Sequence, residues 1–221
     1  MAKEAETVKV FGLALSTCTA RVLTALEEKG ASYEVVNVNL QIGEHKQPTY
    51  LARNPFGQIP ALEDGSLTIF ESRAMARYVA KKYSSSGTDL LRSGNPGEAA
   101  HVDVWLEAEA QHFNPPISTI VYHLVILPVF GGVADEKVVE ENTAKLEKVL
   151  DVYEERLSKS KYLAGDFFSL ADLSHFPYTY YLMKTPKASL ITSRPHVKAW
   201  WEAVSSRPAF KKVAVGMTLG S

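Results

Sequence analysis

The sequence predicts two domains of different class, a mixed α/β domain followed by an all-helical domain. Short strand patterns and helix-length patterns alternate in the first 83 residues. Residues 84–97 are rich in serine and glycine, which is typical of a linker. Beyond this stretch every long apolar pattern has the helical period. We therefore expect domains at residues 1–84 and 98–221, joined by a linker at residues 85–97.

The first domain is expected to begin with a strand, a helix and a second strand. Helical spacing runs from Ser16 to Lys29 and stops at Gly30, and a second helical pattern runs from Glu71 to about Tyr83. Residues 43–53 read as irregular to weakly helical. The expected strands cover residues 8–11, 33–38, 61–63 and 67–70. The first two form a parallel unit with a right-handed crossover, and the complete order, β-α-β-(α)-β-β-α, resembles the thioredoxin fold.

The second domain is expected to contain helices alone. The expected helices cover residues 98–130, 135–157, 170–183 and 196–204, with a final turn at residues 208–213. Ser169 and Asp172 form a capping box, in which the serine begins a helix and the acid three residues later bonds back to it. We interpret this pair as structural. Loss of the Asp172 carboxylate is expected to lower the free energy of unfolding by about 1 kcal/mol.

The composition is typical of a soluble globular protein. The formal net charge is −1, which favours neither nucleic acid nor an anionic membrane as a partner. The one cysteine, Cys18, rules out an internal disulfide and suits a reducing compartment. No apolar run precedes the first strand, so we expect no secretory signal and a cytoplasmic location. The apolar stretch at residues 117–133 is interrupted by His123 and Pro128, and it reads as buried helix, not as a membrane span.

The segment Asn54–Pro60 is the strongest candidate for a binding site. Gln58 and Ile59 precede a proline, which favours extended backbone, and the bond between Ile59 and the proline is a candidate cis peptide. Glu71 and Ser72 then open a helix, whose free N–H groups and serine hydroxyl suit a carboxylate. Together these segments predict a site that holds a small peptide by its backbone and by a terminal carboxylate.

Five motifs resemble those of one enzyme family. They are "STCTAR", "GEHKQP", "NPFGQIPALEDG", "FESRA" and "SKYLAGDFFSLADLSHFP". In this order and spacing they resemble the cytosolic glutathione S-transferases, and more narrowly the plant phi class, from Val8 onward. The resemblance implies the fold of that family, glutathione as cosubstrate, no metal, and no nucleic-acid or membrane partner. It also implies conjugation of the glutathione thiolate to hydrophobic electrophiles in detoxification and stress response, with reduction of organic hydroperoxides as a further expected activity.

Ser16 is the catalytic residue that the resemblance implies, because it matches the family's catalytic serine. Its hydroxyl would donate to the glutathione sulfur and, with the helix dipole, favour the thiolate. The alternative for a serine at this position is an N-cap role alone. In related reductases a catalytic cysteine lies five residues before an arginine. Here Ser16 lies five residues before Arg21, so Cys18 is two residues away from the position of that cysteine. We therefore interpret Cys18 as a thiol without a catalytic role. Thr17 and Thr19 remain alternative hydroxyl donors.

The resemblance also implies a contact for each part of glutathione. A first pair would bind the glycine carboxylate, a second the cysteinyl backbone, and a third the ammonium and carboxylate of the γ-glutamyl group. In that order, the pairs are His45 with Lys46, Gln58 with Ile59, and Glu71 with Ser72. An exposed polar loop is the alternative for the first pair, and ordinary helix capping is the alternative for the third.

Apolar side chains are expected to hold the second substrate and to join two subunits. The candidates for the hydrophobic substrate site are Leu15, Phe113, Ile117 and Val121. The last three have helical spacing, so a core stripe is the alternative. In the resembled family an aromatic residue at the position of Phe56 inserts into the partner subunit, and Arg73 is expected at the same interface of a homodimer. Local packing is the alternative for Phe56.

Three other functions remain open. The same fold could serve as a non-catalytic carrier of flavonoids or hormones, which would bind ligand without turnover. A domain that serves only in assembly, as in elongation factor gamma subunits, is disfavoured because every predicted glutathione contact is present. Thiol transfer through Cys18 would depend on that cysteine and not on Ser16.

Overall fold

The computed structural model of the chain describes residues 7–218, and it divides into two compact units. Unit 1 contains the chain up to Asp89 together with the segment from Lys212 onward, and unit 2 contains Leu90–Lys211. The division therefore falls inside the expected linker. The prediction about a secretory signal concerns the start of the chain, whose residues 1–6 lie outside the described range.

Unit 1 is built on a four-stranded sheet with the order β2-β1-β3-β4. The strands are β1 (Val8–Gly12), β2 (Tyr33–Asn37), β3 (Ala61–Asp64) and β4 (Leu67–Phe70). β1 pairs in parallel with β2 and antiparallel with β3, and β3 pairs antiparallel with β4. In the plane of the sheet, Val10 of β1 lies between its pairing partners Val35 of β2 and Leu62 of β3. Val10 is fully buried, because both faces of this central strand are covered. All four predicted strands are confirmed.

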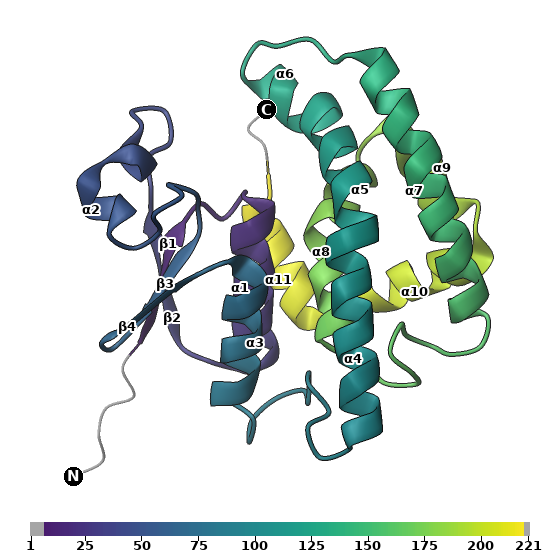
Figure 1. Cartoon of the computed structure of the whole chain (residues 1–221), viewed down its shortest axis with the longest axis horizontal. Helices are drawn as coiled ribbons and strands as arrows, with labels where there is room; N and C mark the ends of the chain where they lie inside the picture. Colours follow the sequence, from purple (N-terminus) through teal and green to yellow (C-terminus); the bar gives the residue numbers. More distant parts are fainter. Residues whose placement is uncertain (1–6, 219–221) are drawn as a thin grey trace. The chain divides into compact units, whose positions relative to one another are not determined.

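Helices cover the two faces of this sheet (Figure 1). They are α1 (Thr17–Glu28), the 3₁₀ turn η1 (Glu44–Lys46), α2 (Pro48–Leu51) and α3 (Ser72–Lys82). A further helix, α11 (Pro208–Gly216), begins in unit 2, and its residues from Lys212 belong to unit 1. α1 and α3 pack against each other on one face, while Tyr50 of α2 packs with Val38 and Ala61 on the other. The predicted thioredoxin-like order is confirmed. The return of the chain from Lys212, where Lys212 Nζ lies 2.8 Å from Glu27 of α1, was not predicted.

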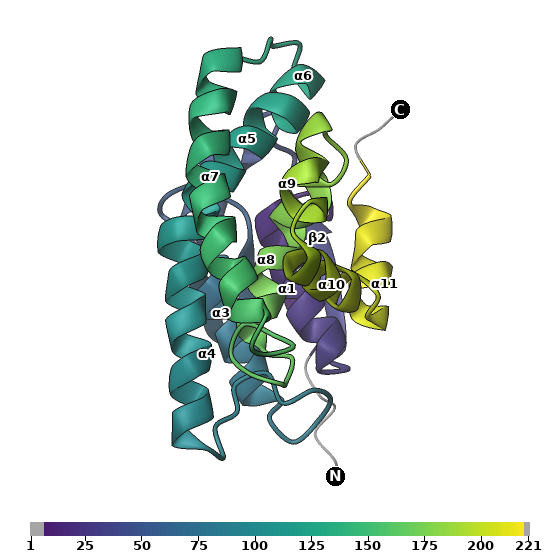
Figure 2. The ribbon, with the colours of Figure 1, turned by 90° about the vertical axis from the view of Figure 1, so that its right-hand side faces the viewer.

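Unit 2 consists of helices, as predicted. They are α4 (Pro96–Ala108), α5 (Asn114–Val121), α6 (Leu127–Val129), α7 (Glu136–Leu157), α8 (Leu170–Leu182), α9 (Ser189–Thr192) and α10 (Pro195–Ser205), with a 3₁₀ turn η4 (Pro186–Ala188). α7 runs alongside α5, and α8 packs on both α4 and α5 (Figure 2). The short helix α9 was not predicted, because four residues are too few for a helical period to be recognised.

Two π-helical turns interrupt the long helix that was expected at residues 98–130. They are η2 (Glu109–Phe113) and η3 (Tyr122–Ile126). Each ends just before a proline, at Pro115 and Pro128. A proline has no N–H and its ring clashes with the carbonyl four residues earlier, so the N–H groups of Asn114 and Leu127 bond five residues back instead.

Asp172 organises the interior of unit 2. Its buried carboxylate accepts four hydrogen bonds of 2.9–3.0 Å, from the N–H and Oγ of Ser169, the N–H of Leu163 and Nε1 of Trp200. The predicted capping box is confirmed, but two of these donors come from outside it. Burial raises the pKa of Asp172, although the four hydrogen bonds oppose that shift.

Substituting Asp172 by Ala should lower the free energy of unfolding by about 3 kcal/mol, more than a cap alone contributes, because four buried donors would lose their acceptor. Urea denaturation followed by tryptophan fluorescence measures the loss. Asp166→Ala is the matched control, since Asp166 accepts an exposed bond from the N–H of Lys161. Equal losses in both variants would contradict the assignment, and Asp172→Asn provides a milder change if the Ala variant does not fold.

Candidate functional site

Ser16 lies at the N-cap of α1, where its side chain can both accept and donate. Its backbone is extended, with φ −70° and ψ 130°, and its Oγ accepts the N–H of Thr19 at 3.4 Å. This bond occupies one lone pair and leaves the hydroxyl proton available for another acceptor. Ser16 is half-buried. The N-cap role is therefore present, and it is compatible with donation to a ligand atom at the helix N-terminus.

The neighbouring candidates occupy different environments. Thr19 is fully buried, and its Oγ1 has no hydrogen-bond partner within the described residues. Thr17 and Cys18 are half-buried on the first turn of α1, and Cys18 Sγ lies 3.9 Å from Nη1 of Arg21. Burial of Thr19 leaves the hydroxyls of Ser16 and Thr17 as the accessible ones at this helix start.

A close approach of two chain segments fixes this helix start. A Cβ atom added at Gly12, the last residue of β1, would lie 2.5 Å from Oγ1 of Thr19 and 3.3 Å from Cβ of Pro60. Only glycine therefore lets the first turn of α1 approach the end of the strand so closely. The Ile59–Pro60 bond is cis, which confirms the prediction.

The turn before Pro60 is held by two residues that the sequence analysis did not select for a role. The carbonyl of Gln58 accepts the hydroxyl of Tyr50 at 3.0 Å and Nδ2 of Asn54 at 2.7 Å. Asn54 also accepts the N–H of Phe56 through its Oδ1 at 3.0 Å. Burial raises the pKa of Tyr50 to about 12, so the phenol keeps its proton and remains a donor. The Gln58 side chain is exposed beside this fixed backbone.

His45 and Lys46 lie in η1, next to the same turn. Nζ of Lys46 donates to the carbonyls of Gly57 at 2.8 Å and Phe56 at 3.3 Å. Nδ1 of His45 is buried and has no hydrogen-bond partner among residues 7–218. Gly57 has φ +57°, and a Cβ there would lie 2.9 Å from the carbonyl oxygen of His45. These two candidates thus lie against the turn that carries Gln58.

Glu71 and Ser72 form a strained helix start. Glu71 has φ +68° and ψ 105°, a conformation that costs a non-glycine residue about 1–3 kcal/mol and is concentrated at functional sites. Its side chain is exposed, whereas Ser72 is 5% exposed. Oγ of Ser72 accepts Nη1 of Arg21 at 2.7 Å. Ser72 is the first residue of α3, so its N–H is one of those without a partner inside the helix.

The sheet register brings the predicted contacts to one edge. Ala61 of β3 pairs with Phe11 of β1 and with Phe70 of β4. Residues 58–59 before β3, residues 71–72 after β4 and the start of α1 after β1 therefore lie at the same end of the sheet. This end of the sheet combines the backbone before a cis proline, two helix N-termini and the hydroxyl of Ser16. Such an arrangement suits a short anionic peptide that carries a nucleophile.

The predicted apolar residues of unit 2 are buried. Phe113, Ile117 and Val121 are each 0% exposed, and Phe113 stacks on Tyr153 with ring centroids 5.7 Å apart. Their burial favours the core alternative for these three positions. Leu15 of unit 1 is exposed.

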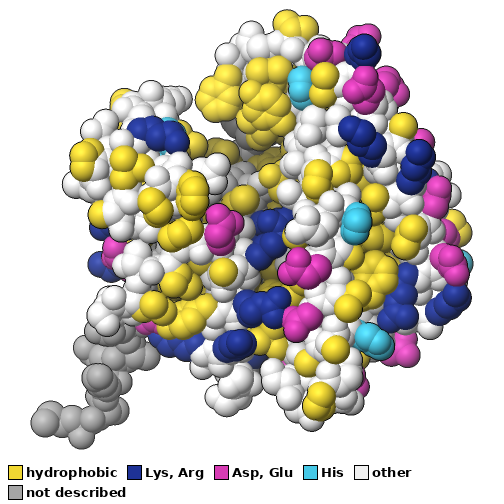
Figure 3. All heavy atoms as spheres, viewed as in Figure 1, with side chains coloured by type: hydrophobic (Ala, Val, Ile, Leu, Met, Phe, Trp, Pro, Cys, Tyr) yellow, Lys and Arg dark blue, Asp and Glu magenta, His cyan; other side chains and the backbone are white. Residues whose placement is uncertain are grey.

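Apolar side chains do reach the surface at the end of unit 2 that carries α6 (Figure 3). The large exposed ones there are Tyr122, Val129, Phe130 and Val133. The prediction of buried helix at residues 117–133 is therefore wrong for these four side chains, because helical period alone does not separate a surface position from a core position.

Phe56 and an apolar cavity of unit 2 are further exposed features. Phe56 is 67% exposed and contacts Phe70 edge to face at 5.9 Å, while Arg73 is half-buried. The cavity has a volume of about 330 Å³ and lies between the end of α4 and the middle of α7. Its lining residues are Trp105, Ala108, His112, Lys148, Val149, Val152 and Tyr153.

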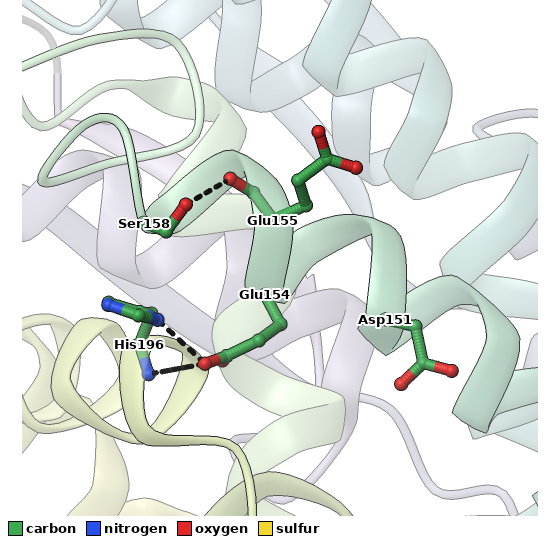
Figure 4. Close-up of a pocket in the computed structure, with 5 residues that line it drawn as sticks. All are labelled: Asp151, Glu154, Glu155, Ser158 and His196. Atoms are coloured by element: carbon green, nitrogen blue, oxygen red, sulfur yellow. Dashed lines mark hydrogen bonds and ion pairs between the residues drawn. The ribbon is translucent and has the colours of Figure 1, made fainter.

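A second cavity of unit 2 is acidic, and its geometry is that of a helix cap (Figure 4). Its volume is about 360 Å³, and it is lined by Asp151, Glu154, Glu155, Ser158 and His196. The Glu154 carboxylate accepts the N–H groups of His196 and Val197 and contacts Nδ1 of His196 at 2.7 Å. Burial alone would raise the pKa of Glu154, but these bonds at the start of α10 hold it below its ordinary value.

Among residues 7–218, no group of three or more His, Cys, Asp or Glu side chains is arranged to hold a metal ion. None of the helices in this range has the length and apolar character needed to cross a membrane.

Comparison with known proteins gives a consistent family. The glutathione S-transferase N-terminal domain matches residues 6–81, and the C-terminal domain of the same family matches residues 113–208. The probable glutathione S-transferase GSTF1 of rice (Oryza sativa subsp. japonica) is 59% identical over 95% of this chain and 96% of its own length.

Solved structures are equally similar. Glutathione transferase F7 from the poplar Populus trichocarpa has 58% identity and a TM-score of 0.95, covering 96% of this chain and 100% of that one. Glutathione S-transferase I from maize, solved in complex with an atrazine glutathione conjugate, has 51% identity and a TM-score of 0.90, covering 96% of this chain and 98% of that one.

The lowered pKa of Glu154 predicts that its contribution to the stability of the folded protein depends on pH. A carboxylate whose pKa is lowered by folding stabilises the native state above its unfolded pKa of about 4.5, and that contribution is lost as the pH falls through the folded pKa. The wild type should therefore be more stable than Glu154→Gln at neutral pH, and the difference should shrink at about pH 3. Thermal unfolding across this range checks the trend. The control is Glu155→Gln, because the ion pair of Glu155 with Lys159 is exposed; a pH-independent difference for Glu154→Gln would contradict the prediction.

Proposed function

This chain belongs to the glutathione S-transferase family, in its plant phi class, and from that premise we propose that Ser16 activates the glutathione thiol. The activity of the chain is that of a glutathione transferase, and glutathione is its cosubstrate. The observation that carries the assignment of Ser16 is its place at the N-cap of α1, where Oγ accepts one N–H and retains its own proton.

The activation required is modest in energy. A free thiol has a pKa of about 8.5, so only a small fraction is thiolate at neutral pH. Lowering that pKa by about two units requires about 3 kcal/mol in favour of the charged form. One hydroxyl donor to the sulfur and the dipole at the N-terminus of a 12-residue helix supply interactions of this size. Ser16 keeps its proton throughout, because the hydrogen bond to the thiolate is what stabilises the charge.

The remaining contacts follow the chemistry of the tripeptide. We assign the glycine carboxylate to His45 and Lys46, because both can donate to an anion. The backbone of Gln58 and Ile59 would pair with the cysteinyl residue, and the hydrogen bonds to the Gln58 carbonyl keep this backbone in place. We assign the γ-glutamyl ammonium to the exposed Glu71 carboxylate, and its carboxylate to the N–H and hydroxyl at the start of α3.

The second substrate is a hydrophobic electrophile. Leu15 offers exposed apolar surface in unit 1, directly before Ser16 in the sequence. In unit 2, taken by itself, we propose that the exposed apolar side chains at residues 122–133 offer a surface for such a substrate, and that Phe113, Ile117 and Val121 belong to the core of the same unit. We also propose a peroxidase activity, in which the thiolate attacks the terminal oxygen of an organic hydroperoxide, the O–O bond breaks, and the alcohol leaves with a proton. The glutathione sulfenic acid so formed then reacts with a second glutathione thiol to give the disulfide and water. The reducing environment suited to a lone cysteine supports a cytoplasmic location.

We propose that two copies associate through Phe56. This aromatic ring is exposed on unit 1, and the cavity of about 330 Å³ on unit 2 is apolar and large enough for a phenyl ring. In a symmetric dimer each copy supplies one ring and one cavity, so both contacts form together. Arg73 would lie at the same interface, and the ring's burial would make it a dominant contact.

Replacing Ser16 by Ala should lower kcat with a chlorodinitrobenzene electrophile by about 100-fold and leave the KM for glutathione nearly unchanged, because the lost bond is made mainly to the thiolate. Steady-state kinetics at saturating glutathione measures this. Thr17→Ala, which removes the adjacent accessible hydroxyl, is the matched control and should stay close to wild type. If wild type binds apolar ligands tightly and turns over neither electrophile nor hydroperoxide, the chain is a carrier and the proposal fails.

Replacing Phe56 by Ala should weaken dimerisation by about 30-fold or more, since a buried aromatic anchor contributes at least about 2 kcal/mol. Sedimentation equilibrium measures the dissociation constant. Ile42→Ala removes another exposed apolar side chain of unit 1, which is 74% exposed, and should have little effect. A Phe56→Ala variant that dimerises as tightly as wild type would show that the ring packs only against its own domain.

A further inference from the structure

Arg21 lies beneath the start of α3 and contacts the proposed carboxylate site from inside the fold. Its side chain is 0% exposed, and its Nη1 is 2.7 Å from Oγ of Ser72. The two residues are 51 positions apart in the sequence and meet because α1 packs on α3. Arg21 also lies on the same helix that begins at Ser16, five residues further on. One helix therefore carries the proposed thiol donor and a cation directed at the opposite end of the ligand.

The direction of the hydrogen bond between Arg21 and Ser72 decides whether the Ser72 hydroxyl can donate to a ligand. A guanidinium has only donors, so Oγ of Ser72 must be the acceptor in the contact with Arg21. A hydroxyl has a single proton, and that proton is then left for a different acceptor. The hydroxyl proton of Ser72 and its N–H, which lies at the first position of α3 and has no partner inside the helix, are therefore two donors that one anion could accept.

We propose that Arg21 is a positioning residue for glutathione: it fixes the Ser72 hydroxyl as a donor and adds buried positive charge beneath the γ-glutamyl carboxylate. This inference rests on the proposed assignment of that carboxylate to Ser72. Arginine keeps its charge even when buried, and a charge inside the protein is screened less than one in water. A lysine cannot reproduce the role fully, because its ammonium is a point charge on a flexible stem and lacks the planar fork.

The competing explanation is that Arg21 only holds α1 against α3. The contact of Nη1 with Cys18 Sγ at 3.9 Å, within α1 itself, is compatible with that explanation. The two explanations differ in what a variant would change. A loss of packing would lower stability and affect every ligand, whereas loss of positioning would affect only ligands that carry the γ-glutamyl carboxylate.

The experiment compares Arg21→Met and Arg21→Lys with wild type on two thiols. One is glutathione, and the other is γ-aminobutyryl-cysteinyl-glycine, which lacks only the α-carboxylate of the γ-glutamyl group. Arg21→Met should raise the KM for glutathione by about tenfold, the size expected for losing a charge-assisted bond, with kcat lowered by less than about twofold. For the analogue the KM should change by less than about twofold. Arg21→Lys should recover part of the loss with glutathione. The KM of Ser72→Ala combined with Arg21→Met should rise by less than the product of the two single effects, because part of the Arg21 effect acts through Ser72.

Lys29→Met is the matched control for a buried cation. Lys29 is 2% exposed and its Nζ donates to the carbonyl of Thr88 at 2.8 Å, in the same unit and away from the proposed site. It should lose thermal stability without a selective rise in the KM for glutathione. Equal rises in KM for both thiols with Arg21→Met, or a fall in kcat at constant KM, would overturn the positioning role. If wild type itself does not prefer glutathione to the analogue, the assignment of the carboxylate to Ser72 is wrong, and the inference about Arg21 fails with it. If the Arg21→Met variant does not fold, Arg21→Lys supplies the comparison with wild type.

Discussion

The close approach at Gly12 is the constraint on which the site of unit 1 depends. Because Gly12 has no side chain, the first turn of α1 and the segment at Pro60 can both lie against the end of β1. A larger residue there would displace Thr19 or Pro60, and with them the helix start that carries Ser16 and the extended backbone before β3. The pairing of Ala61 with Phe11 and Phe70 then brings the start of α3 to the same edge. Three segments distant in sequence are placed by one short strand.

Carboxylates have different tasks in the two units. In unit 2, Asp172 and Glu154 are enclosed by donors from other segments, and both serve as caps for helix N-termini. In unit 1, Glu71 is exposed on a strained backbone with no cap bond to its helix. A helix N-terminus favours a nearby anion. In unit 2 carboxylates of the protein itself supply that anion, whereas in unit 1 we propose that the ligand supplies it.

Local patterns made much of this structure predictable from the sequence. The strands, the cap at Ser16, the capping box and the cis bond before Pro60 each depend on residues a few positions apart, so spacing alone identifies them. The contacts that were missed depend on tertiary structure. Tyr50 reaches the Gln58 carbonyl across a turn, and Arg21 reaches Ser72 across 51 positions. No spacing rule predicts such contacts, because the first forms only once α2 lies against the turn before Pro60, and the second only once α1 has packed on α3.

Prolines mark another limit of sequence reasoning. Pro115 and Pro128 lie within a continuous helical pattern, and either a kink, a break or a wider turn would relieve their clash. The structure adopts the wider turn at both positions. Likewise, helical period placed Phe113 on an apolar face but could not tell a substrate-facing position from a core position, and its stacking on Tyr153 depends on a helix 40 residues later.

We propose that the N-cap of α1 converts a weakly acidic thiol into a nucleophile. A titration of glutathione bound to the enzyme, followed by the ultraviolet absorbance of the thiolate, tests this in wild type and in Ser16→Ala. We expect the pKa of the bound thiol to lie about two units below its free value of about 8.5 in wild type, and to return toward the free value in the variant. A bound thiol that titrates at the same pH in both proteins would rule out this role of Ser16.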